Sequence, residues 1–187
     1  RPAGHYTART EVYGGTAVVS AMVGANDATL AVIAALPIPT GGWLEYVEFG
    51  TRFKDAGDVY IGNSPHPGIF ATPPGQIKVQ LPTIPDAAEL WRTYRRVVEA
   101  HRAGVPARRV PAEGVEAAMC QGLQQAIAHQ AEIGYFTRRD DEGCYQLNLW
   151  GAYRSSWLLM WPLKGLRARR HRREARLLLA SIGEQLP

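Results

Sequence analysis

The sequence has few cysteines, and they stand apart from its histidines. Its 187 residues include two cysteines, Cys120 and Cys144, and five histidines, and neither cysteine has another Cys or His two to five positions away. Zinc ligands usually lie two to five positions apart in the sequence, and no such pair is present here. Two thiols are typical of a reducing compartment, although in an exported protein they could form a bridge. We therefore predict no metal site and no disulfide scaffold.

The sequence also lacks a long apolar run. The nearest candidate is 16–39, which Asn26 and Asp27 interrupt beside Gly24. It falls short of the roughly 18 consecutive apolar residues that a spanning helix needs, and it is more typical of two strands joined by a turn. Because the chain begins with Arg-Pro-Ala-Gly and not with Met, we expect an upstream segment such as a signal or a membrane anchor.

No catalytic or cofactor motif stands out. The glycine pairs 14–15 and 41–42 lack the following helix and lysine that a phosphate-binding loop requires. The acids at 140–142 fall at a predicted hairpin tip in solvent, which makes them poor candidates for acid–base catalysis. The loop 63–68 ("NSPHPG") could present His66 to a ligand, but a proline-stiffened polar turn is the simpler interpretation. We predict no catalytic residue and no cofactor.

Positive charge is concentrated in one segment. Residues 164–176 hold seven of the 21 Lys and Arg residues and one of the 17 acids, Glu174, which leaves 14 basic and 16 acidic residues elsewhere. The segment therefore carries a local charge of +6, whereas the rest of the chain carries −2. We expect an acidic partner to bind here. The basic residues are Lys164, Arg167, Arg169, Arg170, Arg172, Arg173 and Arg176.

Residues 1–104 are predicted to form a β-rich domain closed by one helix. The helix begins at Pro85 or Asp86, shows apolar residues at helical spacing and ends near Gly104. This mostly antiparallel sheet under one covering helix resembles a pleckstrin-homology-like barrel. The expected strands are a hairpin of 16–23 with 28–36, a second hairpin of 43–54 (with a bulge at Gly50) with 58–61, and a short strand at 76–80.

A proline-containing linker, 105–114, is predicted to lead into a second region, 115–187. The order helix, "EIGYF", acidic turn and "CYQLNLWGAY" resembles the end of a winged-helix domain, in which a helix leads into a two-stranded wing. The recognition helix of such a domain brings Lys and Arg to DNA. Residues 115–134 contain neither and include Glu116 and Glu132. We expect a helix–hairpin–helix module used for packing or protein contact, with nucleic-acid binding as the alternative.

The stretch before the basic segment is aromatic. Tyr153, Trp157 and Trp161 follow one another at intervals of four, so they share one face of a helix that Pro162 should end. Tryptophan favours the bilayer interface, and neighbouring Lys and Arg are attracted to anionic lipid. The arginines of 167–176 fall all round a helix, which suits a rod in solvent or headgroups. Either this stripe contacts a membrane or partner, or it closes the core and the arginines keep the tail soluble.

Residues 46–75 and 143–173 are similar to uncharacterised bacterial proteins in which a membrane segment precedes a soluble region. That resemblance implies membrane attachment and no known activity. We therefore predict an α+β, non-catalytic accessory or scaffold protein at the cytoplasmic face of a bacterial membrane. Its predicted partners are an anionic membrane surface or the subunits of a membrane complex, and no small-molecule ligand is identified. A winged-helix nucleic-acid-binding protein comes second, and an enzyme using the "NSPHPG" loop comes third.

Overall fold

The protein has an α+β fold, as the sequence predicts. The computed structural model describes residues 2–12, 15–24, 28–37, 42–54, 57–65, 71–138, 145–160 and 162–183. The strands are β1 (Pro2–Val12), β2 (Gly15–Gly24), β3 (Thr29–Pro37), β4 (Trp43–Thr51), β5 (Val59–Gly62), β6 (Ile77–Gln80), β7 (Phe136–Arg138) and β8 (Tyr145–Leu147). The helices are α1 (Ala87–Arg102), the short 3-10 turn η1 (Ala112–Gly114), α2 (Val115–Glu132), α3 (Leu149–Leu159) and α4 (Leu163–Ser181).

The main sheet has six strands in chain order, with β1 and β6 at its edges. Neighbouring strands from β1 to β5 are antiparallel, which confirms both predicted hairpins and a mostly antiparallel sheet. The last strand, β6, instead pairs parallel to β5, with Val59 opposite Ile77 and Gly62 opposite Gln80. This pairing follows from the long connection between the two strands, which returns the chain to the beginning of β5 before β6 starts.

The predicted bulge at Gly50 is wrong. The register of β4 runs without a shift through Gly50, which lies opposite Leu30 on β3 and Tyr60 on β5. A Cβ atom at Gly50 would lie 2.5 Å from Cδ1 of Tyr60. The glycine therefore leaves room for the Tyr60 ring to lie across the neighbouring strand, and it needs no special backbone conformation for that purpose.

Helix α1 covers one face of the sheet at β4 and β5. It begins where the sequence predicts, because the side chain of Asp86 accepts a hydrogen bond from the backbone N–H of Ala88 at 3.0 Å. Its apolar side contributes Leu90, Tyr94 and Val97 to the main core. Helix α1 is thus the predicted covering helix. Two further helices also pack on the sheet, α4 on the same side as α1 and α2 on the opposite face.

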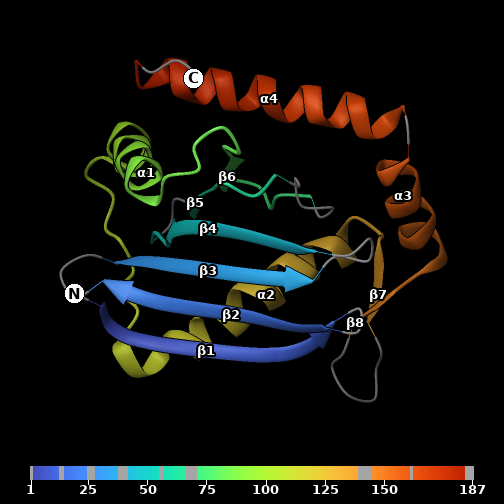
Figure 1. The fold of residues 1–187 in the computed structure, drawn as a ribbon, viewed down its shortest axis with the longest axis horizontal. Coiled ribbons are helices and arrows are strands. Elements are labelled where there is room, and N and C mark those ends of the chain that lie inside the picture. Colours follow the sequence, from blue (N-terminus) through green and yellow to red (C-terminus); the bar gives the residue numbers. More distant parts are fainter. Residues whose placement is uncertain are drawn as a thin grey trace.

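Helix α4 supplies the second layer on this side. Figure 1 shows it running along the top of the molecule, above α1 and β6. Ala175 and Leu179 are buried in the same core as Leu90 and Tyr94, and Leu178 and Ile182 pack against that core. The expectation of a basic rod standing free in solvent or headgroups is therefore wrong, because one side of the helix is packed against the fold.

Helix α2 packs on the opposite face of the sheet, behind β1 to β3 in Figure 1. Val115 is buried against Ala21 and Val23 of β2, with Leu30, Val32 and Met119 around them. The predicted linker 105–114 is itself tied to the sheet, because Lys54 N–H donates to the Pro106 carbonyl and Arg108 N–H donates to the Arg52 carbonyl. Both predicted regions thus pack on one sheet, and the boundary between them stays a prediction.

The packing of α4 predicts different effects for two neighbouring leucines. Leu179 is 1% exposed, whereas Leu177, two residues earlier on the same helix, is 62% exposed. Leu179→Ala should lower the free energy of unfolding by about 2–5 kcal/mol, because it leaves a cavity in the core. Leu177→Ala should change it by less than about 0.5 kcal/mol. Urea denaturation of both variants measures the difference, and equal small effects would mean that α4 does not share the core.

Candidate functional site

Helix α3 is fixed at its beginning by Asn148. The Oδ1 atom of Asn148 accepts from Gly151 N–H at 2.7 Å, and its Nδ2 atom donates to the Gly134 carbonyl at 3.0 Å. Gly151 passes so close to the Tyr135 carbonyl that a Cβ atom there would collide with it. The helix ends at Leu159, just before Pro162, as the sequence predicts. These contacts hold α3 against the end of α2.

Three aromatic side chains form an exposed row along α3. The ring centroids of Trp150 and Tyr153 are 5.8 Å apart, and those of Tyr153 and Trp157 are 5.7 Å apart. These side chains are 56%, 54% and 44% exposed in chain order. Tyr153 and Trp157 therefore do not close the core. The third predicted member of the stripe, Trp161, lies outside the described residues, and Trp150, three positions before Tyr153, was missed.

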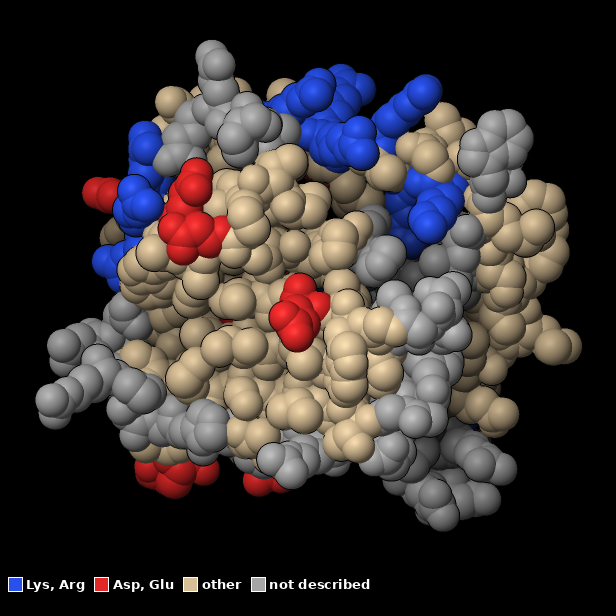
Figure 2. Space-filling view, in the orientation of Figure 1, with Lys and Arg blue, Asp and Glu red and all other residues tan. Residues whose placement is uncertain are grey.

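The exposed basic residues lie on α4, the helix that follows α3 and contacts it. Figure 2 shows Lys and Arg gathered along the upper edge of the molecule, where α4 runs in Figure 1. Arg169, Arg172, Arg173 and Arg176 are exposed and recur at intervals of three and four, so they form one stripe along the helix. Lys164 is also exposed near the beginning of α4, which contacts α3. We call the exposed row of α3 together with this stripe the α3–α4 corner.

A cavity lies between β6 and the other side of α4. Its volume is about 910 Å³. The walls come from the segment that ends in β6, from α4, from Arg154 of α3, and from Tyr135 and His101. The α4 residues that line it are Leu163, Leu166, Arg167, Arg170, His171, Glu174, Leu177, Leu178 and Ser181. Arg167 and Arg170, both predicted as surface contacts, line this cavity; Arg167 is half-buried there, whereas Arg170 is exposed at its edge.

The charges in this cavity are unevenly paired. Glu174 accepts from Arg170 at 2.8 Å and lies 3.4 Å from His171. Arg167 is half-buried, and among the described residues it has no acidic partner. Burial lowers the pKa of its guanidinium from the usual value. Burial also lowers the pKa of His171, an effect that Glu174 opposes and the two arginines reinforce.

Arg154 is the second cation of the cavity lining that has no acidic partner within the described ranges. Its guanidinium lies over the ring of Tyr135, 4.8 Å from the centroid, in a cation–π contact. Lys78 also lines the cavity, but its ammonium lies 3.6 Å from Glu48, which compensates its charge. The cavity cations without an acidic partner are therefore Arg154, which is exposed, and Arg167, which is half-buried.

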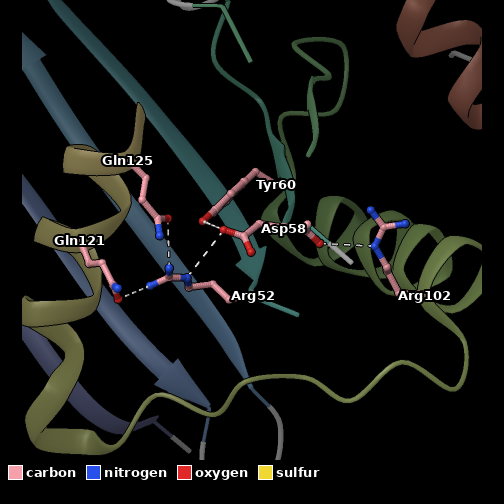
Figure 3. A network of polar contacts seen from close by, with 7 residues as sticks. Arg52, Asp58, Tyr60, Arg102, Gln121 and Gln125 are labelled. Carbon is pink, nitrogen blue, oxygen red and sulfur yellow. Dashed lines mark hydrogen bonds and ion pairs between the residues drawn. The ribbon is translucent and has the colours of Figure 1, made fainter. Parts of the chain in front are cut away.

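A polar network on the opposite face of the sheet holds α2 in place. Arg52, just after β4, donates to Gln121 at 2.9 Å and to Gln125 at 3.1 Å, and its Nε atom lies 3.6 Å from Asp58 (Figure 3). Tyr60 donates to the same carboxylate at 3.0 Å. Two side chains of α2 and the carboxylate of Asp58, just before β5, thus converge on a single arginine, and Tyr60 of β5 binds the same carboxylate. Sequence patterns gave no sign of this network, because its members are far apart in the chain.

Helix α2 is further tied down by Gln130. Its Oε1 atom accepts from Ala71 N–H at 3.1 Å, and its Nε2 atom donates to the Ala71 carbonyl at 2.9 Å. Three glutamines of α2 are therefore engaged with the rest of the fold, and Val115, the first residue of the helix, is buried against β2. The helix that resembles a recognition helix is thus packed against the sheet on one side.

The described part of the "NSPHPG" loop is also committed to the sheet. Asn63 accepts from Val47 N–H at 2.7 Å through Oδ1, and Ser64 N–H donates to Gln80 at 2.9 Å. His66 lies outside the described residues. The loop positions that the structure describes therefore bind neighbouring strands, which is the role expected of a structural turn.

Within the described ranges, no cluster of three or more His, Cys, Asp or Glu residues is placed to hold a metal ion. Nor is any helix in these ranges both long and apolar enough to span a bilayer. Cys120 is an exposed free thiol, and Cys144 lies outside the described residues.

Comparison with protein-family models, with curated proteins and with solved structures finds no match to this chain.

The polar network predicts an alkaline loss of stability. Burial, and next the Asp58 charge, raise the pKa of Tyr60 above its ordinary value of about 10. The folded state thus holds this proton more tightly, and the stabilisation is complete below about pH 10 and is lost as pH rises above it. Tyr60→Phe should therefore lose less stability between about pH 9 and pH 11 than the unsubstituted protein.

Urea midpoints measured across this pH range test the prediction, with the exposed Tyr153→Phe as the matched control. Tyr60→Phe should also cost about 1.5–3 kcal/mol at neutral pH, because it removes a hydrogen bond to a carboxylate. Parallel alkaline losses in all three proteins would show that Tyr60 is not held in its neutral form by the fold.

Proposed function

We propose that this chain is a non-catalytic accessory protein that attaches to an anionic membrane surface through the α3–α4 corner. The observation that carries the proposal is the exposed row of Trp150, Tyr153 and Trp157 beside the exposed arginine stripe of α4. Aromatic rings favour the level of the lipid headgroups, and each nearby Lys or Arg gains about 1 kcal/mol from anionic lipid. Both kinds of group are exposed on two helices, α3 and α4, that contact each other.

The packing of α4 supports this orientation. Because Ala175 and Leu179 hold one side of the helix in the core, the stripe of Arg169, Arg172 and Arg173 faces outward without further ordering. A preorganised stripe loses less conformational entropy on binding than a flexible basic tail would. The negatively charged cytoplasmic leaflet of a bacterial membrane is the surface that this chemistry fits best.

A role as a subunit of a larger membrane complex is part of the same proposal. Ile33 and Trp43 are exposed on the face of the sheet opposite α2, because they alternate with residues that face the helix. The middle of the view in Figure 2, on this side of the sheet, is largely uncharged. Exposed apolar surface of this kind is typical of contacts between proteins.

The arginine stripe gives the first test of the surface proposal. Arg169, Arg172 and Arg173 changed together to Gln should weaken binding to vesicles containing phosphatidylglycerol by roughly a hundredfold at low salt. The control changes Arg92, Arg108 and Arg109 to Gln, which removes the same charge from exposed positions outside α4. Sedimentation at increasing salt gives both affinities. Equal losses in the two triple variants would mean that only net charge matters.

The aromatic row gives the second test. Trp150→Ala with Trp157→Ala should reduce vesicle binding while the thermal midpoint stays nearly unchanged, because both side chains are exposed. Trp43→Ala, which removes an exposed tryptophan of β4, should leave vesicle binding intact. The proposal fails if the double variant binds normally. Tight binding to a DNA duplex that depends on the same arginines, with no vesicle binding, would favour the nucleic-acid alternative.

A further inference from the structure

The cavity between β6 and α4 has the dimensions of a ligand site. Its volume of about 910 Å³ is near the upper end of the range of roughly 300–1,000 Å³ in which small molecules bind. Its walls come from separate parts of the chain: the segment 71–79, His101 of α1, Tyr135, Arg154 of α3, and α4. Since α4 is anchored in the core by Leu179, the walls are held in place by the fold itself.

Two cations of the cavity, Arg154 and Arg167, have no acidic partner in the described part of the chain and could bind an anionic group. Arg167 is half-buried, and its loss of solvent is compensated by no carboxylate in the described part of the chain. Arg154 lies across the Tyr135 ring at the edge of the same space. A guanidinium binds a phosphate or carboxylate through paired hydrogen bonds, and such bonds strengthen where water is excluded.

The remaining walls are mixed: besides polar residues such as Gln76, His101 and Ser181 they carry a group of apolar side chains. Leu163, Leu166 and Leu178 project from α4, and Ile77 and Val79 belong to β6. A small inorganic anion would leave these side chains in contact with water, whereas a neutral apolar ligand would leave Arg167 without a partner. The lining therefore matches a molecule with an acid group at one end and an apolar chain at the other.

We propose that this cavity binds the monomer of an anionic amphiphile, a phosphate or carboxylate on a single acyl chain. Arg154 and Arg167 bind the acid group, and the leucines of α4 together with Ile77 and Val79 enclose the chain. The site is separate from the exposed corner that contacts the membrane surface, so it can be tested in solution without a bilayer.

The test uses octyl phosphate below the concentration at which it forms micelles, with calorimetry as the readout. Inorganic phosphate and octyl glucoside, which carry the charge alone and the chain alone, should each bind at least about tenfold more weakly. In methyl NMR spectra, octyl phosphate should shift the signals of Ile77 and Val79. Equal binding of either partial ligand, or binding without these shifts, would overturn the proposal.

Variants locate the acid group. Arg154→Gln with Arg167→Gln should weaken octyl phosphate binding by roughly tenfold or more, since hydrogen bonds to charged groups are lost. Arg169→Gln, an exposed arginine of the same helix that does not line the cavity, should bind normally. Thermal midpoints check that each variant is folded. Removing the half-buried charge of Arg167, which has no acidic partner in the described ranges, should not lower the midpoint.

A vesicle-binding experiment distinguishes the cavity proposal from the membrane-surface proposal. The Arg154 and Arg167 double variant should still sediment with phosphatidylglycerol vesicles, because the exposed stripe and the aromatic row are intact. If the protein binds vesicles but no octyl phosphate monomer, the cavity proposal is wrong and the surface proposal stands. If it binds the monomer but no vesicles, the surface proposal is wrong and the cavity proposal stands.

Discussion

The burial of one narrow side of α4 is the interaction on which the other features depend. Ala175 and Leu179 are the only members of this helix that the described structure buries fully, and both join the core formed with α1 and β5. Their position sets the rotation of the whole helix. One neighbouring side then carries the exposed arginines, and the other side forms the roof of the cavity above β6. Without this packing the same sequence would be a charged and mobile tail.

The sequence predicts the elements whose signals are local. Apolar runs around a turn predict the β2–β3 hairpin, Asp86 marks the start of α1, and Pro162 marks the end of α3. The parallel pairing of β6 could not be predicted in this way, because it depends on a connection of many residues and on pairing between distant segments. A glycine within a strand can mark either a bulge or the close approach of another group. The sequence alone therefore does not distinguish a bulge at Gly50 from the contact with the Tyr60 ring.

The candidate site could be predicted only in part, for a related reason. The charge of α4 and the spacing of Tyr153 and Trp157 are visible in the sequence, and the structure places them on two helices that contact each other. The cavity is not visible, because Arg154 and Arg167 meet Ile77 only after the chain has folded back on itself. The spacing of apolar residues also does not predict that α4 packs on one side. Its two buried residues, Ala175 and Leu179, stand among many arginines and give only a weak helical pattern.

The orientation of the protein on a membrane tests the central claim most directly. With all five tryptophans replaced by 5-fluorotryptophan, each gives a fluorine NMR signal that can be assigned by single Trp→Phe variants. Anionic vesicles that contain a nitroxide-labelled lipid should broaden the signals of Trp150 and Trp157, because these side chains would lie at the headgroups. The signals of Trp43, exposed on β4, and Trp91, packed on the core, should stay sharp. Broadening of Trp43 without Trp150 and Trp157 would contradict the account.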